Sequence, residues 1–547
     1  MLESLFVKNY KGFKEAQIDF KPITLFLGEN SAGKTSLIQL LLMLFQTAQP
    51  SKLREKSPLD LHGHFAKMGP VEHLFRNKDT SKPFEISIKF TNNGSSFWLS
   101  RYLREFVRSI FRTTSSLRLA GLNDLFYRTA KSGDTERYTD DDLMETKTFS
   151  IFISKFVDVI SKPNAQDYIR QSDSINTFGT CVSLSDFYNP SKQDFIAVHS
   201  MLSSLQDAVR GKSDYTVSYT FTYERKKLVI SVIKIMVDSI VLFELSKKDS
   251  EYVFHSDLYD ISGMNSRHVD AIGSHFLHNS SIFSCFEYPF DNLNRKNNET
   301  TLANYFLKIV QRILEDLTDE FDLDQINHIG PLRAAPKHYY VLDKDHYFDF
   351  FDCSDPETCV EILKNYPQTK EYVNEWLNEF GFSVDVSESR EEMINHLIVD
   401  QDENKLNIPE VGFGVSQILP ILIQCHSAES TSLTMIEQPE IHLHPKMQAE
   451  LANLFADVIA KKDKKLVIES HSEYMLRRLR RLMAEKTQLI PEEVAIYYFE
   501  RKGSNSEKDY ISVKSLKISD TGAFEWPEEF YKTDLEDNLA FLRLQKE

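Results

Sequence analysis

The chain has 547 residues, of which 41% are hydrophobic and 27% are charged, so a folded globular protein of two or three structural units is expected rather than a disordered or fibrous one. Its formal net charge of −17 weighs against a generally basic nucleic-acid-binding protein. Because surface charge acts over only about 10 Å, the negative net charge does not exclude a local basic groove. The five cysteines form no C-x-x-C pair, and no apolar stretch has the length of a membrane span or the form of a signal peptide. We therefore expect a cytoplasmic protein without a zinc site.

The first 27 residues predict three strands. Apolar and polar residues alternate near Leu5 and again near Ile18, and residues 9–13 (Asn-Tyr-Lys-Gly-Phe) turn the chain between these two runs. Residues 23–27 form an apolar run that predicts a buried strand.

Residues 28–35, Gly-Glu-Asn-Ser-Ala-Gly-Lys-Thr, match the P-loop pattern G-x-x-x-x-G-K-[ST] between that strand and an apolar helix that runs to about residue 46. Such a loop points backbone N–H groups and a helix N-terminus at phosphate oxygens. We expect Lys34 to reach the β- and γ-phosphates of ATP, and Thr35 to hold Mg²⁺. The predicted nucleotide-binding set is Asn30, Ser31, Ala32, Gly33, Lys34, Thr35 and Ser36.

The middle of the chain changes in character. Residues 84–90 alternate strictly and predict a strand, and Asn-Asn-Gly at 92–94 predicts a hairpin turn into a strand at 97–99. Charged and aromatic residues then mix over 101–210. Beyond them, three strands are predicted at 215–221, 227–232 and 240–243, and a helix is predicted at 300–318.

No internal repeat or low-complexity linker separates these segments, so we expect an insertion within a nucleotide-binding fold. The predicted parts are an N-terminal lobe at 1–100, an insertion for partner or dimer contacts at 101–325, and a C-terminal lobe at 326–547. The predicted fold class is α/β, a P-loop NTPase with a mixed sheet flanked by helices and a mainly helical α+β insertion.

Two apolar strands of the C-terminal part end in polar residues. The strand at 433–436 ends in Glu437, which is the Walker B pattern when it lies downstream of a P-loop. We expect Glu437 to lie near Mg²⁺, which prefers carboxylate and phosphate oxygens; a surface acid at a strand end is the alternative. The strand at 466–468 ends near His471, which can hydrogen-bond a γ-phosphate or the attacking water, or can simply be a packed histidine.

A glycine-containing segment at 411–417 opens an apolar helix about twenty residues before the acidic strand. Gly414 allows close approach, and Ser416 with Gln417 at the helix start would contact a γ-phosphate. A common Gly-x-Gly turn is the alternative interpretation.

The helix after His471 carries basic residues on one face. The simpler interpretation is a solvated basic face, and the more specific one is direct contact with a nucleic-acid backbone or a partner. The residues concerned are Arg477, Arg478, Arg480 and Arg481.

In this order, the P-loop, the Ser-Gln signature, the acidic strand end and the strand-end histidine resemble those of ABC-type ATPases of the structural-maintenance (SMC), RecF and overcoming-lysogenization branch. Residues 7–13 are similar to the opening of that branch, and residues 436–445 and 468–476 to its Walker B and switch-histidine segments. Residues 329–333 and 526–530 are similar to segments of a subgroup of bacterial ATPases. Within the branch, the chain most resembles the ATPases of Septu-type anti-phage systems, including those attached to retrons.

The resemblance covers residues 1–80 and 327–530 and implies ATP and Mg²⁺ as cofactors. It implies that two copies pair head to tail, with ATP between the P-loop of one chain and Ser416 of the other, and that hydrolysis releases the dimer. It also implies an ATP-dependent switch that controls a separate HNH-type nuclease and, in a retron-attached system, contacts with a reverse transcriptase and its nucleic acid.

One residue departs from the branch, which usually has a glutamate as general base after the first Walker B acid. Here that position is Gln438. An amide cannot accept a proton, and loss of a general base costs about 10²–10⁴ in rate, so slow hydrolysis is expected unless Glu440 or His471 compensates. The candidate catalytic set is Glu437, Gln438, Glu440 and His471.

Two other functions stay open on the sequence. One is a DNA-repair or recombination ATPase of the RecF or Rad50 type that clamps duplex ends, and the net charge counts against it. The other is a scaffold in which ATP is structural and never turned over, which Gln438 favours.

Overall fold

The structure is a computed structural model and divides into two compact units. One contains Met1–Leu2, Ser51–Leu59 and Thr80–Glu320, and the other contains Glu3–Pro50, Asp60–Asp79 and Phe321–Glu547. The described residues are 1–49, 57–91, 98–116, 127–129, 135–139, 141–165, 192–248, 251–259, 269, 281–283, 301–322, 325–333, 335–342, 355–388, 394–401, 404–427, 432–461, 464–486, 488–503, 510–526 and 541.

The P-loop lies in the unit that comprises Glu3–Pro50, Asp60–Asp79 and Phe321–Glu547. The strands of this unit follow the order β1-β2-β19-β18-β3-β17-β16-β11. Strands β18, β3, β17, β16 and β11 run parallel, whereas β1 with β2 and β18 with β19 are antiparallel. The bounds are β1 Leu2–Tyr10, β2 Phe13–Asp19, β3 Ile23–Gly28, β11 Ile326–Ile329, β16 Leu433–Glu437, β17 Lys465–Glu469, β18 Val494–Lys502 and β19 Tyr510–Leu516.

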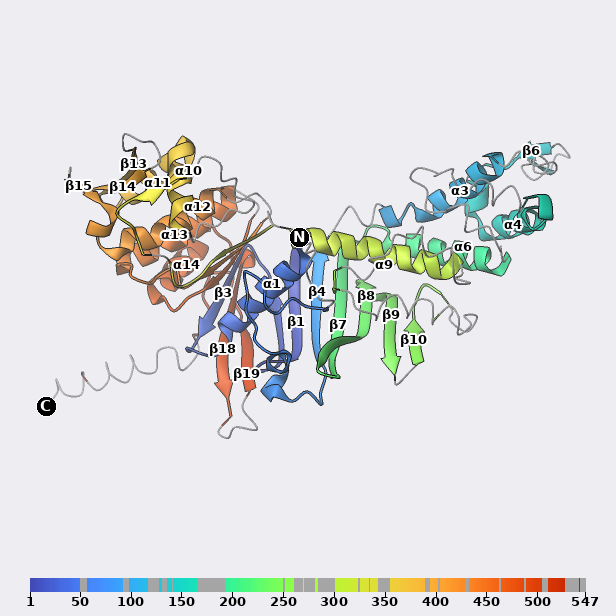
Figure 1. The fold of residues 1–547 in the computed structure, drawn as a ribbon, viewed down its shortest axis with the longest axis horizontal. Coiled ribbons are helices and arrows are strands. Elements are labelled where there is room, and N and C mark those ends of the chain that lie inside the picture. Colours follow the sequence, from blue (N-terminus) through green and yellow to red (C-terminus); the bar gives the residue numbers. More distant parts are fainter. Residues whose placement is uncertain are drawn as a thin grey trace. The chain divides into compact units, whose positions relative to one another are not determined.

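Helices cover both faces of the parallel strands, which explains why β3, β16 and β17 are buried along their whole length and mostly apolar before the polar residues that end β16 and β17. Ile23, Leu25 and Leu27 of β3 share one core with α12, α13 and α14, which lie together (Figure 1). On the opposite face the Phe26 ring contacts the rings of Tyr497 and Phe499. The helices are α1 Lys34–Ala48, α10 Pro356–Asn365, α11 Pro367–Asn378, α12 Phe413–Ser427, α13 Pro445–Lys461 and α14 Glu473–Glu485.

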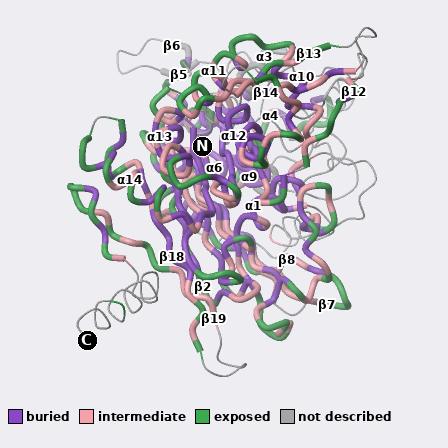
Figure 2. Tube along the Cα trace, turned by 90° about the vertical axis from the view of Figure 1, so that its left-hand side faces the viewer, coloured by how far each residue is buried: buried purple, intermediate pink, exposed green. Residues whose placement is uncertain are grey.

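A second, smaller sheet of this unit packs with α10 and α11. Its strands follow the order β12-β14-β13, and β15 also pairs with β14. The bounds are β12 Tyr340–Val341, β13 Phe382–Glu388, β14 Ile394–Gln401 and β15 Asn404–Asn407. Figure 2 shows buried segments inside this unit, and α14 has buried and exposed residues in turn, as its amphipathic sequence requires.

The other compact unit combines an antiparallel set of strands, β10-β9-β8-β7-β4, with helices that include α9 beside α6 (Figure 1). Phe106 of α3 ties the helices together through ring contacts with Phe149 of α4, Phe195 of α6 and Tyr305 of α9. The bounds are β4 Phe84–Thr91, α3 Tyr102–Ser116, β5 Tyr127–Thr129, β6 Thr135–Arg137, α4 Thr146–Ile160, α6 Lys192–Val209, β7 Asp214–Glu224, β8 Lys227–Val237, β9 Ile240–Lys248, β10 Glu251–His255 and α9 Thr301–Asp319.

The predicted strands and helices are confirmed, with one exception. The predicted strand at 97–99 is wrong for Trp98 and Leu99, which are helical; the predicted turn at 92–94 lies outside the described residues. The reason is that β4 pairs along its whole length with β7, from Phe84 opposite Phe221 to Thr91 opposite Asp214. A local Asn-Asn-Gly signal could not reveal this distant partner. In the part of the chain that is described, no helix is long and apolar enough to cross a bilayer.

Asp316 on α9 is a buried carboxylate, and burial raises its pKa to about 6 even though the Arg312 guanidinium lies 2.8 Å from its Oδ1 and opposes that shift. The folded state therefore keeps a proton between about pH 4 and pH 6 that the unfolded chain has lost, so stability falls as pH rises through this window. We predict that Asp316→Asn raises the free energy of unfolding at pH 7 by up to about 3 kcal/mol and by little at pH 4. Denaturant unfolding at both pH values tests this, and equal effects at both would contradict it.

Candidate nucleotide-binding site

The P-loop joins β3 to α1 through two glycines that no other residue could replace without strain. Gly28 has φ 136°, and a Cβ added there would lie 2.2 Å from the Phe499 carbonyl oxygen. Gly33 has φ 93°, and its Cβ would lie 2.6 Å from Ile511 Cδ1 and 2.8 Å from the Phe13 ring. Strands β2, β18 and β19 thus press on the loop and fix its backbone.

The rest of the predicted phosphate-binding set follows this loop into α1. Asn30, Ser31 and Thr35 are exposed, and Ser31 has a positive φ of 62°. Ala32 is buried, and Ser36 donates its N–H to the Gly33 carbonyl 3.0 Å away as the helix begins. The arrangement leaves exposed loop positions in front of the N-terminus of α1, where an anion is stabilised.

Lys34 carries the central charge of the site. It is only 3% exposed, and its ammonium donates to the carbonyl oxygens of Gly28 at 2.9 Å and Glu29 at 2.8 Å. Its Nζ also lies 3.8 Å from Glu469 Oε1. Burial lowers the pKa of Lys34, and the carboxylates of Glu469, Glu440 and Glu29 oppose that shift. The ammonium is folded back on the loop and is surrounded by oxygen atoms.

Two carboxylates lie at the ends of neighbouring strands. Glu437 ends β16 and is paired in register with Glu469, which ends β17. Glu437 Oε1 lies 2.8 Å from His328 Nε2 at the end of β11. Glu469 Oε2 accepts a 3.1 Å hydrogen bond from the hydroxyl of Thr35. The predicted Thr35 and Glu437 therefore belong to one region, but in this structure the acid in contact with Thr35 is Glu469.

Glu440 links the two strand ends to each other. Its Oε1 accepts the backbone N–H of His471 at 2.6 Å, and its Oε2 accepts the Ser470 hydroxyl at 3.0 Å. Burial raises the pKa of Glu440, and these hydrogen bonds oppose that shift. Each carboxylate oxygen thus holds one group of the chain in place and keeps a further lone pair as an acceptor.

Gln438 lies in the left-handed region with φ 46°, which is uncommon for a residue other than glycine. Its backbone N–H donates to the Glu469 carbonyl 2.7 Å away. From the other side, Arg333 Nη2 donates to the carbonyl oxygens of Glu437 at 3.0 Å and Gln438 at 3.3 Å. The sharp turn after β16 is therefore held by β17 and by a buried guanidinium.

His471 follows β17 at the same edge of the sheet. Burial, helped by the positive charge of Lys34, lowers its pKa to about 4, so the imidazole is neutral at neutral pH. Its Nε2 is buried and has no hydrogen-bond partner among the described residues. A neutral ring with a free nitrogen beside Lys34 can hydrogen-bond a phosphate oxygen or a water.

The predicted signature residues lie at the start of α12. Ser416 and Gln417 are buried, and the Ser416 hydroxyl donates to the Phe413 carbonyl at 2.8 Å within its own helix. Gly414 lies close to the backbone at His442, since a Cβ on Gly414 would lie 3.2 Å from the His442 carbonyl oxygen. The structure thus places these residues on a separate helix, with the Ser416 hydroxyl bonded to that helix rather than to the P-loop.

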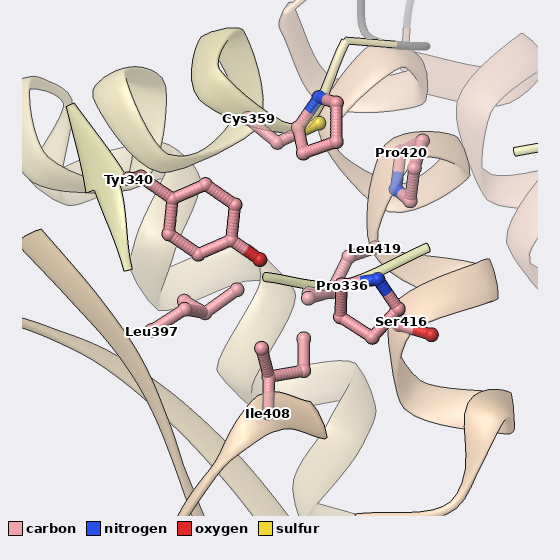
Figure 3. Close-up of a pocket in the computed structure, with 9 residues that line it drawn as sticks. Pro336, Tyr340, Cys359, Leu397, Ile408, Ser416, Leu419 and Pro420 are labelled. Carbon is pink, nitrogen blue, oxygen red and sulfur yellow. The ribbon is translucent and has the colours of Figure 1, made fainter. Parts of the chain in front are cut away.

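Ser416 also borders a small cavity of about 30 Å³, and its oxygen points away from the Tyr340 ring (Figure 3). That volume has room for water and is far too small for a nucleotide. The lining is mostly apolar and comprises Pro336, Tyr340, Pro356, Cys359, Leu397, Ile408, Ser416, Leu419 and Pro420. The cavity is a packing gap behind the signature helix.

The four arginines of α14 all have partners inside the chain. Arg477 pairs with Glu473, Arg478 with Glu450 at 2.7 Å, and Arg481 with Glu485 at 2.7 Å. The Arg480 guanidinium lies over the rings of Phe524 at 5.3 Å and Trp526 at 5.5 Å. This pairing favours a structural and solvated basic face.

Sequence reasoning did not assign His328, Arg333 or Glu469 to the site. All three lie at or just beyond the ends of β11 and β17, which flank β16. The available signal was that carboxyl ends of parallel strands meet at one sheet edge, so every polar residue that ends such a strand is a candidate. The strand order that makes Glu469 the neighbour of the P-loop strand was not readable from one sequence.

Fold and site together define a P-loop ATPase. Among the described residues, no three His, Cys, Asp or Glu side chains are grouped to hold a metal, but Mg²⁺ in such sites takes one or two carboxylates, a hydroxyl and phosphate oxygens. Thr35, Glu437 and Glu469 fit that donor set. Residues 1–476 match the model of the AAA ATPase domain family, and the chain belongs to this family.

Among curated proteins, the chain is similar to the DNA replication and repair protein RecF. RecF of Lactobacillus acidophilus is 24% identical over 101 residues, which is 18% of this chain and 26% of that protein. RecF of Listeria monocytogenes is 31% identical over 88 residues, 16% of this chain and 23% of that protein. The chain thus matches about a quarter of the length of these relatives.

Among solved structures, the chain is similar to SMC head domains. The head domain from Thermotoga maritima is 8% identical with a TM-score of 0.33, over 94% of this chain and 99% of that one. The Pyrococcus furiosus head domain has an extended coiled coil and is bound to the C-terminal domain of ScpA. It is 12% identical with a TM-score of 0.33, over 100% of this chain and 99% of that one. These overlaps are loose, and the class rests on the family match and the strand order.

We predict that Arg333→Ala lowers the free energy of unfolding by about 2–4 kcal/mol, because two carbonyl oxygens of the turn after β16 lose a buried charged donor. Denaturant unfolding measures the change. Arg481→Ala, which removes an exposed guanidinium paired only along its own helix, is the matched control and should behave like wild type. Equal stability of the two variants would contradict the role given to Arg333.

Proposed function

We propose that this protein binds Mg²⁺–ATP at residues 28–36, hydrolyses it slowly, and uses it as a switch for self-assembly and for control of a separate effector. The observation that carries the proposal is the buried Lys34 ammonium, which lies between the P-loop carbonyls and a strand-end carboxylate beside a neutral histidine. Phosphate oxygens can take over the contacts that Lys34 now makes with Gly28 and Glu29. Mg²⁺ would screen the phosphates from the nearby carboxylates when it is bound.

Slow turnover follows from the groups available to act as a base. Gln438 stands at the position of the usual general base and cannot accept a proton, so hydrolysis depends on Glu440, whose two oxygens each already accept one hydrogen bond, or on His471. The site therefore favours holding ATP over cleaving it. This property suits a switch whose ATP-bound form persists.

We predict that Gln438→Glu raises the ATP turnover rate by about 10²-fold or more, because it restores a general base. ATP affinity should change by less than a few-fold, since the backbone contact of residue 438 with Glu469 is retained. Steady-state phosphate release and equilibrium ATP binding measure the two effects. The same rate in both proteins would remove Gln438 as the cause of slow turnover.

For assembly we propose a head-to-tail pair in which Ser416 at the start of α12 caps the ATP bound in a second copy. The helix start carries the partial positive charge that a γ-phosphate requires. The exposed Phe413 ring, with 60% of its surface accessible, gives this helix start an apolar contact. ATP would then bridge the two chains.

Ser416→Ala should leave ATP binding to the P-loop intact while it weakens ATP-dependent dimerisation by about tenfold, since it removes one polar contact across the interface. Calorimetry reports the first quantity and analytical ultracentrifugation the second. Ser427→Ala at the opposite end of α12 is the control and should leave both unchanged. Dimerisation of Ser416→Ala at wild-type strength would exclude this interface.

The effector proposed is an HNH-type nuclease, in an anti-phage system of the Septu type that is sometimes attached to a retron. The support is the resemblance of residues 329–333 and 526–530 together with the ATPase class. A nuclease or reverse-transcriptase gene beside the gene for this protein, and co-purification of the nuclease in ATP, would test it.

Direct DNA binding of the RecF or Rad50 type is the second candidate function, and the similarity to RecF favours it. The net charge of −17 and the internal partners of the α14 arginines count against it. Salt-sensitive binding of duplex DNA by the wild-type protein would favour this function.

A further inference from the structure

Glu469 is a carboxylate with an unusual place in the site. It ends β17, which lies between the P-loop strand β3 and the Walker B strand β16, and it is paired in register with Phe26 on one side and Glu437 on the other. Its side chain is only 5% exposed. A buried acid in this position needs a positive or hydrogen-bonding partner.

Both oxygens of Glu469 face the two P-loop side chains that are expected to hold the nucleotide. Oε2 accepts the Thr35 hydroxyl at 3.1 Å, and Oε1 lies 3.8 Å from the Lys34 ammonium. Glu437, the expected partner of the metal, instead has its Oε1 2.8 Å from His328 Nε2. The acid that contacts the predicted metal-binding hydroxyl is therefore Glu469.

We propose that Glu469 is a second carboxylate of the Mg²⁺–ATP site and makes nucleotide binding depend on the metal. This inference rests on the proposed ATP-binding function and adds a residue to it. With Mg²⁺ bound beside Thr35, Glu469 and Glu437 would lie on neighbouring strand ends as the two acidic groups near the ion. Mg²⁺ characteristically takes one or two carboxylates together with substrate phosphates.

The charges around Glu469 give the proposal its sign. Glu469 Oε1 lies 3.8 Å from the Lys34 ammonium, and Glu469 is paired in register with Glu437, a second acid on the neighbouring strand. Without a metal, a carboxylate at this point repels the phosphates and competes with them for Lys34. With Mg²⁺, the same carboxylate attracts the ion that the phosphates bring, so Glu469 opposes metal-free binding and supports metal-dependent binding.

The test is the equilibrium binding of a non-hydrolysable ATP analogue, measured by calorimetry in excess Mg²⁺ and in EDTA. Glu469→Gln retains an oxygen that can accept the Thr35 hydroxyl, so the fold should persist. We expect the ratio of the affinity in Mg²⁺ to the affinity in EDTA to fall by about 10–100-fold in this variant, the range typical for loss of a group that orients a metal's ligands. Binding in EDTA should be equal to or tighter than that of wild type. Mn²⁺ affinity of the nucleotide complex, followed by electron paramagnetic resonance, should fall in parallel.

Glu485→Gln is the control. Glu485 is an exposed carboxylate of α14 that pairs with Arg481 and lies outside the P-loop, so its removal changes the net charge of the protein by the same amount. It should leave the Mg²⁺-to-EDTA affinity ratio close to that of wild type. A fall of the same size in both variants would mean that general charge, not Glu469, sets the metal dependence.

An unchanged affinity ratio and Mn²⁺ affinity in Glu469→Gln would overturn the inference while the ATP-binding function stands. Equal weakening with and without metal would also overturn it, since Glu469 would then only position Lys34 and Thr35. If the wild-type protein binds no nucleotide in either solution, the proposed function itself fails.

Discussion

A buried ammonium must be surrounded by oxygen atoms, and the nucleotide site is arranged around this requirement of Lys34. The P-loop supplies two carbonyl oxygens and the end of β17 supplies a carboxylate. Residues of β18, β19 and β2 lie so close to Gly28 and Gly33 that a Cβ at either position would clash. Glycine at both positions therefore allows the loop to fold closely around the ammonium. Burial keeps the His471 imidazole neutral, and the positive charge of Lys34 beside it adds to this effect.

The parallel strand order turns this local requirement into a site. Strands β3, β17, β16 and β11 end at one edge, which brings together Lys34, Glu469, Glu437 and His328 from segments far apart in the sequence. Glu440 and Arg333 then fix the turns that follow β16 and β17. Two side-chain contacts, Lys34 with Glu469 and His328 with Glu437, and the hydrogen bonds of Arg333 and Glu440 thus fix these strand ends.

The local elements were predictable because each carries its own signal. The alternating burial of β4, the uniform burial of β3, and the P-loop pattern all appear in the structure. What one sequence does not contain is the order of strands across a sheet. The turn signal at 92–94 therefore predicts a strand at Trp98 and Leu99, although β4 pairs with β7. The motifs likewise predict Mg²⁺ between Thr35 and Glu437, although the acid that accepts the Thr35 hydroxyl is Glu469. The motifs identified which residues matter, and the tertiary pairing decided which of them meet.

The central claim is that ATP at Lys34 controls assembly, and light scattering with simultaneous phosphate release tests it most directly. Wild type and Lys34→Ala are compared with and without Mg²⁺–ATP. The account predicts that ATP raises the mass of the wild-type protein, that phosphate release is slow, and that Lys34→Ala loses both responses. The same mass and turnover in both proteins would contradict it, because the P-loop would then not be the organising site, and a scaffold with structural ATP would be favoured.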